Sequence, residues 1–118
     1  MARVITFFPK QVYMGAQAGP LTVISEIFEL SEENELLVEL RVHGSNPSSL
    51  SLTGQIETTS DSTFVDSAWK QAGSNVATTS LQTGTVTGLQ RYVRAKLTVP
   101  TTGWAYAGVN AVARRLAP

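Results

Sequence analysis

The sequence predicts an all-β protein, folded as a single antiparallel β-sandwich domain over residues 1–118. Apolar and polar residues alternate with a period of two in residues 36–42, 50–57 and 92–99, as in strands with one buried and one wet face. Charged residues make up 15% of the chain, against a usual value of about 25%. Thr, Ser, Gly and Val, which suit sheets and tight turns, are abundant. The length fits one domain, and the lack of cysteine excludes disulfides and thiolate sites.

The N-terminal segment, residues 1–20, is either the first strand of the sandwich or an N-terminal arm. It begins with the strand-like RVITFF, carries aromatic residues with little alternation, and continues into the flexible GAQAG. If this run does not pair within the sandwich, its aromatic side chains are exposed unless a partner covers them. Phe7, Phe8 and Tyr13, together with Arg3, are therefore candidate partner-binding residues.

Residues 27–42 fit two local structures. IFEL, a polar SEEN turn and ELLVELRV together predict a β-hairpin, and Val38 and Val42 favour strands. Ser31 as an N-cap, acidic residues in the first turn and leucines at helical spacing predict a helix instead. The hairpin is preferred because the neighbouring segments also have β character.

The rest of the chain supplies further strands and turns. HGSNPSS and TVPTTGW are predicted turns, in which Pro47 and Pro100 fix φ while Gly44 and Gly103 permit positive φ. Clusters of Gly, Pro, Asn or Ser bound the other strand segments, at spacings that suit a sandwich or barrel. These segments are residues 21–30, 50–58, 79–89, 91–99 and 103–113.

The C-terminal residues 110–118 are a candidate C-terminal arm. In that structure Arg114 and Arg115 would reach acidic groups on a neighbouring molecule. The alternative is an ordinary frayed end.

The charges are unevenly distributed along a chain whose net charge is zero. All nine acidic residues lie between Glu26 and Asp66, and six of the nine basic residues follow Asp66. The two halves can interleave in the folded domain and give an evenly mixed surface. Alternatively, the molecule has an acidic and a basic pole, which would suit packing against copies of itself or a large partner.

The sequence offers poor material for catalysis, and we expect no enzymatic activity, no cofactor and no metal site. His43 is the single histidine, and its position beside a glycine at a strand end suits a turn better than a general base. The sequence contains no G-x-S-x-G elbow and no glycine-rich phosphate loop. The acidic residues at 32–35 lack calcium-loop spacing, and a weak divalent site at Asp61 and Asp66 is the alternative left open.

Neither nucleic acid nor a membrane is an expected partner. Tyr92, Arg94 and Lys96 share one face of a strand, as in single-strand binders, but the chain as a whole is neutral. No apolar run approaches about 18 residues, and Pro9 and Lys10 interrupt the N-terminal run before it reaches signal-peptide length. We expect a soluble protein that is made in a cytoplasm.

Two stretches carry a resemblance to known proteins. QIETTSDSTFVDSAWKQAG and TGLQRYVRAKLTVPTTGW place a Glu-Thr strand end, a Ser-Asp turn, a tryptophan and an Arg-Tyr-Val-Arg strand in order. This order is similar to jelly-roll modules of the discoidin and carbohydrate-binding type. It is more similar to small jelly-roll structural proteins of tailed bacteriophages, including capsid decoration or cement proteins. The resemblance covers about residues 50 to 113 and implies a jelly-roll-like sandwich in which Trp69 plugs one open end.

The resemblance also implies a function. A decoration or cement protein is a non-enzymatic virion protein that binds the major capsid protein on the assembled phage head and stabilises it. It would be made in the host cytoplasm, reside on the capsid surface and form a homo-oligomer, a trimer. A tail or connector subunit would share the fold and have another partner. A carbohydrate-binding or receptor-contact module is the alternative of a different class, and Trp69, Trp104 and Tyr106 would form its glycan platform.

Overall fold

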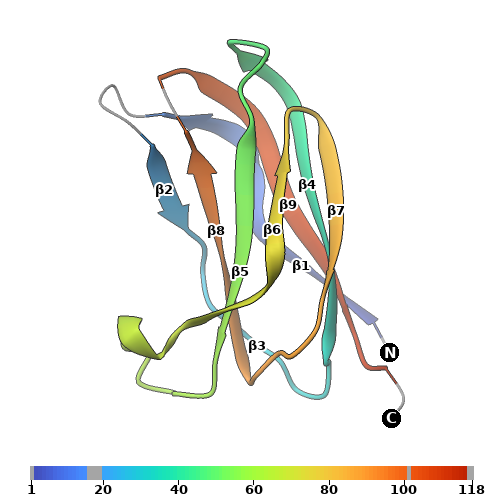
Figure 1. Cartoon of the computed structure of the whole chain (residues 1–118). Coiled ribbons are helices and arrows are strands. Elements are labelled where there is room, and N and C mark those ends of the chain that lie inside the picture. The colour runs from blue at the N-terminus through green and yellow to red at the C-terminus, as the bar shows by residue number, and fades with distance from the viewer. Residues whose placement is uncertain (1, 16–19, 101, 117–118) are drawn as a thin grey trace.

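The computed structural model describes residues 2–15, 20–100 and 102–116, and these residues fold almost entirely as β-structure (Figure 1). They contain nine strands and a 3-10 helix of three residues, η1 (Asp66–Ala68). The strands are β1 (Ala2–Met14), β2 (Leu21–Ile24), β3 (Phe28–Glu29), β4 (Glu35–Asn46), β5 (Leu52–Thr59), β6 (Lys70–Thr78), β7 (Leu81–Val86), β8 (Tyr92–Val99) and β9 (Trp104–Arg114). The prediction of an all-β chain is confirmed.

Two antiparallel sheets pack face to face. The first sheet has the strand order β1-β9-β4-β7, and the second has the order β2-β8-β5-β6, with the short β3 also paired to β8. Figure 1 shows the second sheet in front of the first. The chain crosses between the sheets after β1, β3, β4, β6, β7 and β8, which gives the double-sheet arrangement of a jelly roll. The predicted antiparallel, jelly-roll-like sandwich is confirmed.

The core lies between the sheets and follows the period-two patterns. Leu36, Val38 and Leu40 of β4 in the first sheet and Val93 and Leu97 of β8 in the second belong to one core cluster, and all five side chains are fully buried. Alternate positions along each strand point outward, as strand geometry requires.

The N-terminal residues form part of this core. Residues 2–14 are β1, an edge strand that pairs with β9 along its length. Phe7 packs edge-to-face on Phe28 of β3, with ring centroids 5.5 Å apart, and Phe8 packs on Tyr13 at 5.8 Å. The three β1 aromatics are buried, so they are not exposed on an arm as one alternative expected. Residues 16–19 of the predicted flexible segment lie outside the described residues.

The expected hairpin over residues 27–42 is wrong in its pairing, although its second strand exists. Residues 35–46 are strand β4, which rules out the helix. β3 pairs with β8 in the second sheet, whereas β4 pairs with β9 and β7 in the first. β3 and β4 thus belong to different sheets, and the SEEN segment between them crosses from one sheet to the other.

The two sides of the sandwich differ. Strands β6 and β7 come together at one side, where a Cβ added to Gly73 of β6 would lie 3.1 Å from a methyl carbon of Val86 in β7. The absence of a side chain at Gly73, which has a φ of 74°, permits this close approach. At the other side, β1 and the short strands β2 and β3 leave an opening between the sheets.

Candidate functional site

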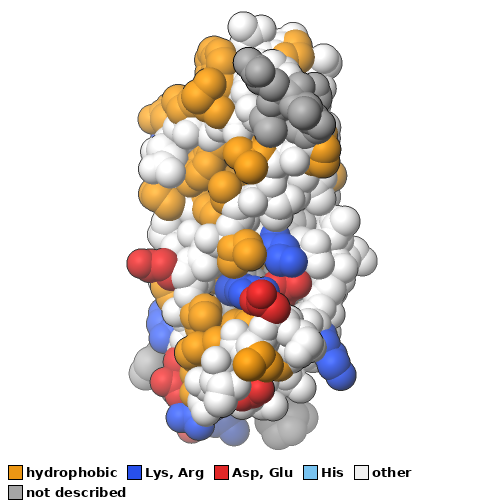
Figure 2. All heavy atoms as spheres, turned by 90° about the vertical axis from the view of Figure 1, so that its left-hand side faces the viewer, with side chains coloured by type: hydrophobic (Ala, Val, Ile, Leu, Met, Phe, Trp, Pro, Cys, Tyr) orange, Lys and Arg blue, Asp and Glu red, His pale blue; other side chains and the backbone are white. Residues whose placement is uncertain are grey.

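The opening between β1 and β2–β3 is the candidate functional site, and we call it the open side. Its upper part is a groove of about 620 Å³ whose lining is partly apolar, with Phe8, Pro9 and Ile24, and partly polar, with Gln11 and Glu26. Its lower part is a cleft of about 830 Å³, lined mainly by charged and polar groups of β1, the residues around β3 and the loop before β8. Figure 2 shows this side of the molecule, with hydrophobic side chains gathered in its upper half and charged ones, among further hydrophobic ones, in its lower half.

At the upper groove, a partner can contact side chains more readily than it can pair a strand with the edge of β1. The register of β1 against β9 shifts between Thr6 and Phe8 and again between Phe8 and Gln11, and Pro9 lies within this irregular stretch. Bulges and proline on an edge strand oppose the addition of another strand. Ile24 of the four-residue β2 is 52% exposed beside the groove. A partner would therefore bind here through side-chain contacts and not by adding a strand to β1.

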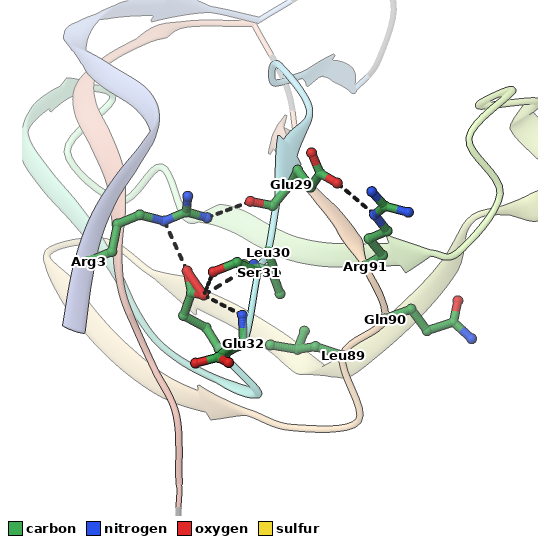
Figure 3. Close-up of a pocket in the computed structure, with 9 residues that line it drawn as sticks. Arg3, Glu29, Leu30, Ser31, Glu32, Leu89, Gln90 and Arg91 are labelled. Carbon is green, nitrogen blue, oxygen red and sulfur yellow. Dashed lines mark hydrogen bonds and ion pairs between the residues drawn. The ribbon is translucent and has the colours of Figure 1, made fainter. Parts of the chain in front are cut away.

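The lower cleft is organised by arginine side chains from distant parts of the chain (Figure 3). Arg3 of β1 donates from Nη2 to the backbone oxygen of Glu29 at 2.8 Å, and its Nε lies 3.2 Å from Glu33 Oε1. Arg91, just before β8, pairs with the Glu29 carboxylate at 2.6 Å. These contacts join β1, β3 and β8 at the lower end of the open side.

Glu33 is the most strongly held carboxylate of the cleft. Its Oε2 accepts hydrogen bonds from the backbone N–H and hydroxyl of Ser31, at 3.2 and 3.0 Å, and from the backbone N–H of Glu32 at 3.0 Å. Burial alone would raise the pKa of Glu33, but the backbone and Ser31 hydrogen bonds and the Arg3 charge lower it to about 2. The ionised form of Glu33 is thus part of the native structure.

We predict an acid-dependent loss of stability from this residue. A carboxyl whose folded pKa lies below its unfolded value stabilises the fold above the unfolded pKa, and this contribution is lost as pH falls from about 4.5 to about 2. Glu33→Gln should reduce the free energy of unfolding by about 1–2 kcal/mol at pH 7, with a difference from wild type that shrinks toward zero near pH 2. Urea unfolding at several pH values measures this effect. Glu32→Gln is the control, because the Glu32 side chain is 75% exposed, and an equal pH dependence in both variants would contradict the prediction.

Arg114 and Arg115 pair within the molecule. Arg114 Nε lies against the carboxylate of Glu35, and Arg115 Nη1 lies 3.5 Å from Glu32 Oε2. Both arginines thus have acidic partners within the molecule, and their contact with acids of a neighbouring molecule stays a prediction. β9 extends to Arg114, so most of the suggested C-terminal arm is strand, and residues 117–118 lie outside the described part.

The uneven charge distribution is compensated in three dimensions. Seven ion pairs form among the described residues, and six of them join an acid of the stretch from Glu26 to Asp66 to a base outside it. The exception is the local pair Arg41 with Glu39. This pattern agrees with the mixed-surface interpretation and not with separate acidic and basic poles.

Trp69 is a structural plug, but on a different surface from the one expected. It is 7% exposed and lies on the outer face of the second sheet, with its ring 4.3 Å from the guanidinium carbon of Arg94 and stacked on Phe64 at 6.1 Å. Beneath it, Glu57 pairs with Arg94 at 2.9 Å and with Lys96 at 3.2 Å. The indole covers this ion cluster and does not close the end of the sandwich.

The three residues of the expected glycan platform are not brought together. Trp104 and Tyr106 lie on the outer face of β9 in the first sheet and are 39% and 38% exposed, while Trp69 is buried on the second sheet. Val12 and Met14 of β1 pair in register with Tyr106 and Trp104. Val12 and Met14 could not be recognised as outward-facing from the sequence, because the irregular stretch around Pro9 hides the alternation of β1.

Quenching by acrylamide should separate the two tryptophans. Trp69→Phe leaves Trp104 as the single indole, and Trp104→Phe leaves Trp69. Under dilute, monomeric conditions, the fluorescence of Trp104 should be quenched several-fold more efficiently, because its ring is exposed on β9. Equal quenching of the two variants would show that the indole of Trp69 is not covered.

No catalytic group stands out in the geometry of the described residues. His43 lies in β4 and not in a turn, and its ring centroid is 5.6 Å from that of Tyr106. Asp61 accepts hydrogen bonds from the N–H and hydroxyl of Thr63, at 2.9 and 2.7 Å, as a turn-forming residue does. Within the described ranges, no three His, Cys, Asp or Glu side chains gather as a metal site needs. No helix in those ranges has the length and apolarity that a membrane crossing requires.

Comparison with known proteins supports the fold. No protein-family model matches the chain, and no curated protein matches its sequence. The chain is similar in structure to a chain in the structure of infectious bursal disease virus Gx strain (15% identity, TM-score 0.53). It is also similar to a chain in the crystal structure of the VP2 subviral particle of that virus (13% identity, TM-score 0.53). Each alignment covers 98% of this chain and 32% of the other, so this chain spans about a third of their length. A crystal structure of PirA is also similar (12% identity, TM-score 0.48, 95% of this chain and 91% of the other).

Proposed function

We propose that this chain is a non-enzymatic virion structural protein of the capsid decoration or cement type, which binds the assembled phage head and stabilises it. The observation that carries the proposal is the open side, where a groove lined by apolar and polar side chains adjoins a cleft that holds most of the charged groups of this side. The jelly-roll sandwich supports it, because the chains from the virus and from the subviral particle have a similar fold. The resemblance of residues 50 to 113 to phage structural proteins points the same way.

The open side suits a protein partner with mixed chemistry. Apolar side chains of the major capsid protein would enter the upper groove beside Ile24 and Pro9, and polar groups would meet Glu29 and Arg91 at the lower cleft. A stable interface of standard size buries about 1,600 Å² in total. Weak contacts repeated over many capsid sites would raise the avidity without a tight single contact.

Co-sedimentation tests this proposal. Capsids assembled from the major capsid protein of the same virus should carry the wild-type chain into the pellet. Ile24→Asp should reduce the bound fraction at least about tenfold, since burial of a charge in an apolar contact is unfavourable. Ser74→Asp, at an exposed position of β6 far from the open side, should bind like wild type. Failure of the wild-type chain to pellet with the capsids would refute the proposal.

A carbohydrate-binding or receptor-contact function is the second candidate. Trp104 and Tyr106 favour it, because both rings are exposed on one face of β9 at positions two residues apart. In the Trp69→Phe variant the fluorescence comes from Trp104 alone, so a glycan that stacks on this ring should change the emission. A flat response across glycan classes would count against glycan binding at this site.

A further inference from the structure

The outer faces of the two sheets differ in character. Eight large hydrophobic side chains are exposed on the strands of the first sheet, the rear layer in Figure 1. On the strands of the second sheet, only Leu21 and Ile24 of β2 are exposed in this way among the described residues. We call the outer face of the first sheet the β1–β9 face. Its exposed hydrophobic residues are Val4, Val12, Met14, Leu37, Leu81, Trp104, Tyr106 and Val112.

The strand register divides most of these residues into two apolar patches. The lower patch is a row across three strands, in which Val4 of β1 and Leu37 of β4 both pair with Val112 of β9. The upper patch contains Tyr106 and Trp104 of β9, paired with Val12 and Met14 of β1. Tyr106 and Val112 are six positions apart on β9, a distance of about 20 Å.

A charged waist lies between the two patches. Glu39 of β4 pairs in register with Asn110 of β9, and Arg41 pairs with Gly108. The acid and the base therefore lie one residue below and one residue above the level of Val109. On β1, Val12 pairs with residue 106 of β9 and Val4 pairs with residue 112. Val12 therefore lies three residues above the level of Val109, and Val4 lies three residues below it.

We propose that a second copy of this chain packs against the β1–β9 face, with the strands of the two copies antiparallel. The two-fold axis lies between the facing first sheets of the two copies. It runs across the strands at the level of Val109. In such an isologous contact each residue meets the one at the mirrored level, and the reverse contact forms as well. Val12 then meets Val4 of the second copy, and Tyr106 meets Val112 of the second copy.

The same symmetry matches the two charges of β4 on this face. Glu39 faces Arg41 of the second copy, and Arg41 faces its Glu39, which gives two complementary pairs. At the ends of the face, the Trp104 ring meets Arg114 of the second copy, an arrangement suited to a cation–π contact. A parallel arrangement with β4 packed on β4 of the second copy would instead place Glu39 against Glu39.

The area of the face is sufficient for a stable dimer. The 11 residues of β9 extend over about 36 Å, and four strands cover about 19 Å. Each copy thus presents about 700 Å², so that the contact buries about 1,400 Å² in total, within the range of specific interfaces. This inference does not rest on the proposed capsid function, and it replaces the trimer implied by the resemblance with a dimer.

Charge reversal tests the pairing. Analytical ultracentrifugation of the wild-type chain should show a monomer–dimer equilibrium. Glu39→Arg should raise the dimer dissociation constant at least about tenfold, because it places arginine against Arg41 of the second copy. The double variant E39R/R41E restores opposite charges and should dimerise within about threefold of wild type. The proposal is overturned if the wild-type chain stays monomeric at high micromolar concentration or forms a trimer. It is also overturned if the Glu39→Arg variant dimerises as well as the wild type.

Cross-linking tests the antiparallel register. The chain has no cysteine, so Val4→Cys and Val12→Cys each introduce a single thiol at a well exposed position of β1. A short bismaleimide should join Val4→Cys to Val12→Cys in an equal mixture and should give little covalent dimer with either variant alone. Efficient cross-linking of either variant alone, with no extra product in the mixture, would contradict the register. Circular dichroism confirms that both variants are folded.

Discussion

Glu57→Gln should lower the free energy of unfolding by about 3–5 kcal/mol, because the substitution leaves buried charge without a partner. Glu57 is the common acceptor for Arg94 and Lys96 on the outer face of the second sheet, with donor distances of 2.9 and 3.2 Å. Its side chain and that of Arg94 are each only 9% exposed, since Trp69 covers the cluster. The amide keeps the shape but not the charge. Urea unfolding followed by circular dichroism measures the loss.

Glu29→Gln is the matched control for this prediction. Glu29 also pairs with an arginine, Arg91, but the two side chains are 52% and 64% exposed. Exposed ion pairs contribute about 0–1 kcal/mol, so this variant should unfold close to wild type. A loss below about 1 kcal/mol for Glu57→Gln, or equal losses for both variants, would show that the cluster is not shielded from water.

Gly103→Ala should destabilise the fold by about 2–4 kcal/mol. Gly103 precedes β9 and has a φ of +146°, a conformation that side chains rarely adopt. A Cβ at this position would lie 2.4 Å from the backbone oxygen of Asn46, at the end of β4. The backbone of one of the two segments must therefore shift. Thermal unfolding followed by circular dichroism tests this expectation.

Gly44→Ala provides the comparison within the same region. A Cβ at Gly44 has no atom within 4 Å, and its φ lies outside the positive range. Alanine in this strand should change the stability by less than about 1 kcal/mol. Both glycines were expected to permit positive φ from their positions in turns, and only Gly103 uses that freedom. If Gly103→Ala unfolds like Gly44→Ala, the close approach to Asn46 is not rigid.

Much of the fold could be predicted from the sequence because period-two alternation is a local property. Residues 36–42 and 92–99 alternate clearly, and both lie in long strands. Alternation does not say which strands pair, however, and the hairpin between β3 and β4 was wrong for that reason. Strand β6 was missed because only Ala72 and Val76 of its residues are buried and the register is irregular between them.

The surfaces were harder to predict because they depend on contacts between residues distant in sequence. Nothing local indicates that Glu35 meets Arg114, 79 residues away, or that Arg94 lies under Trp69. Burial of Phe7 and Phe8 depends on whether the first segment pairs, and the sequence left both outcomes open. The open side itself follows from the short lengths of β2 and β3, which composition does not reveal.

Electron cryomicroscopy of capsids saturated with this chain tests most directly whether the open side is the capsid-binding surface. We expect additional density on the outer surface of the shell that fits the jelly-roll sandwich. The groove formed by β1 and β2 should face the major capsid protein, with Ile24 in contact with the shell. A chain that binds with its open side turned to solvent, or a shell without additional density, would contradict the proposed attachment.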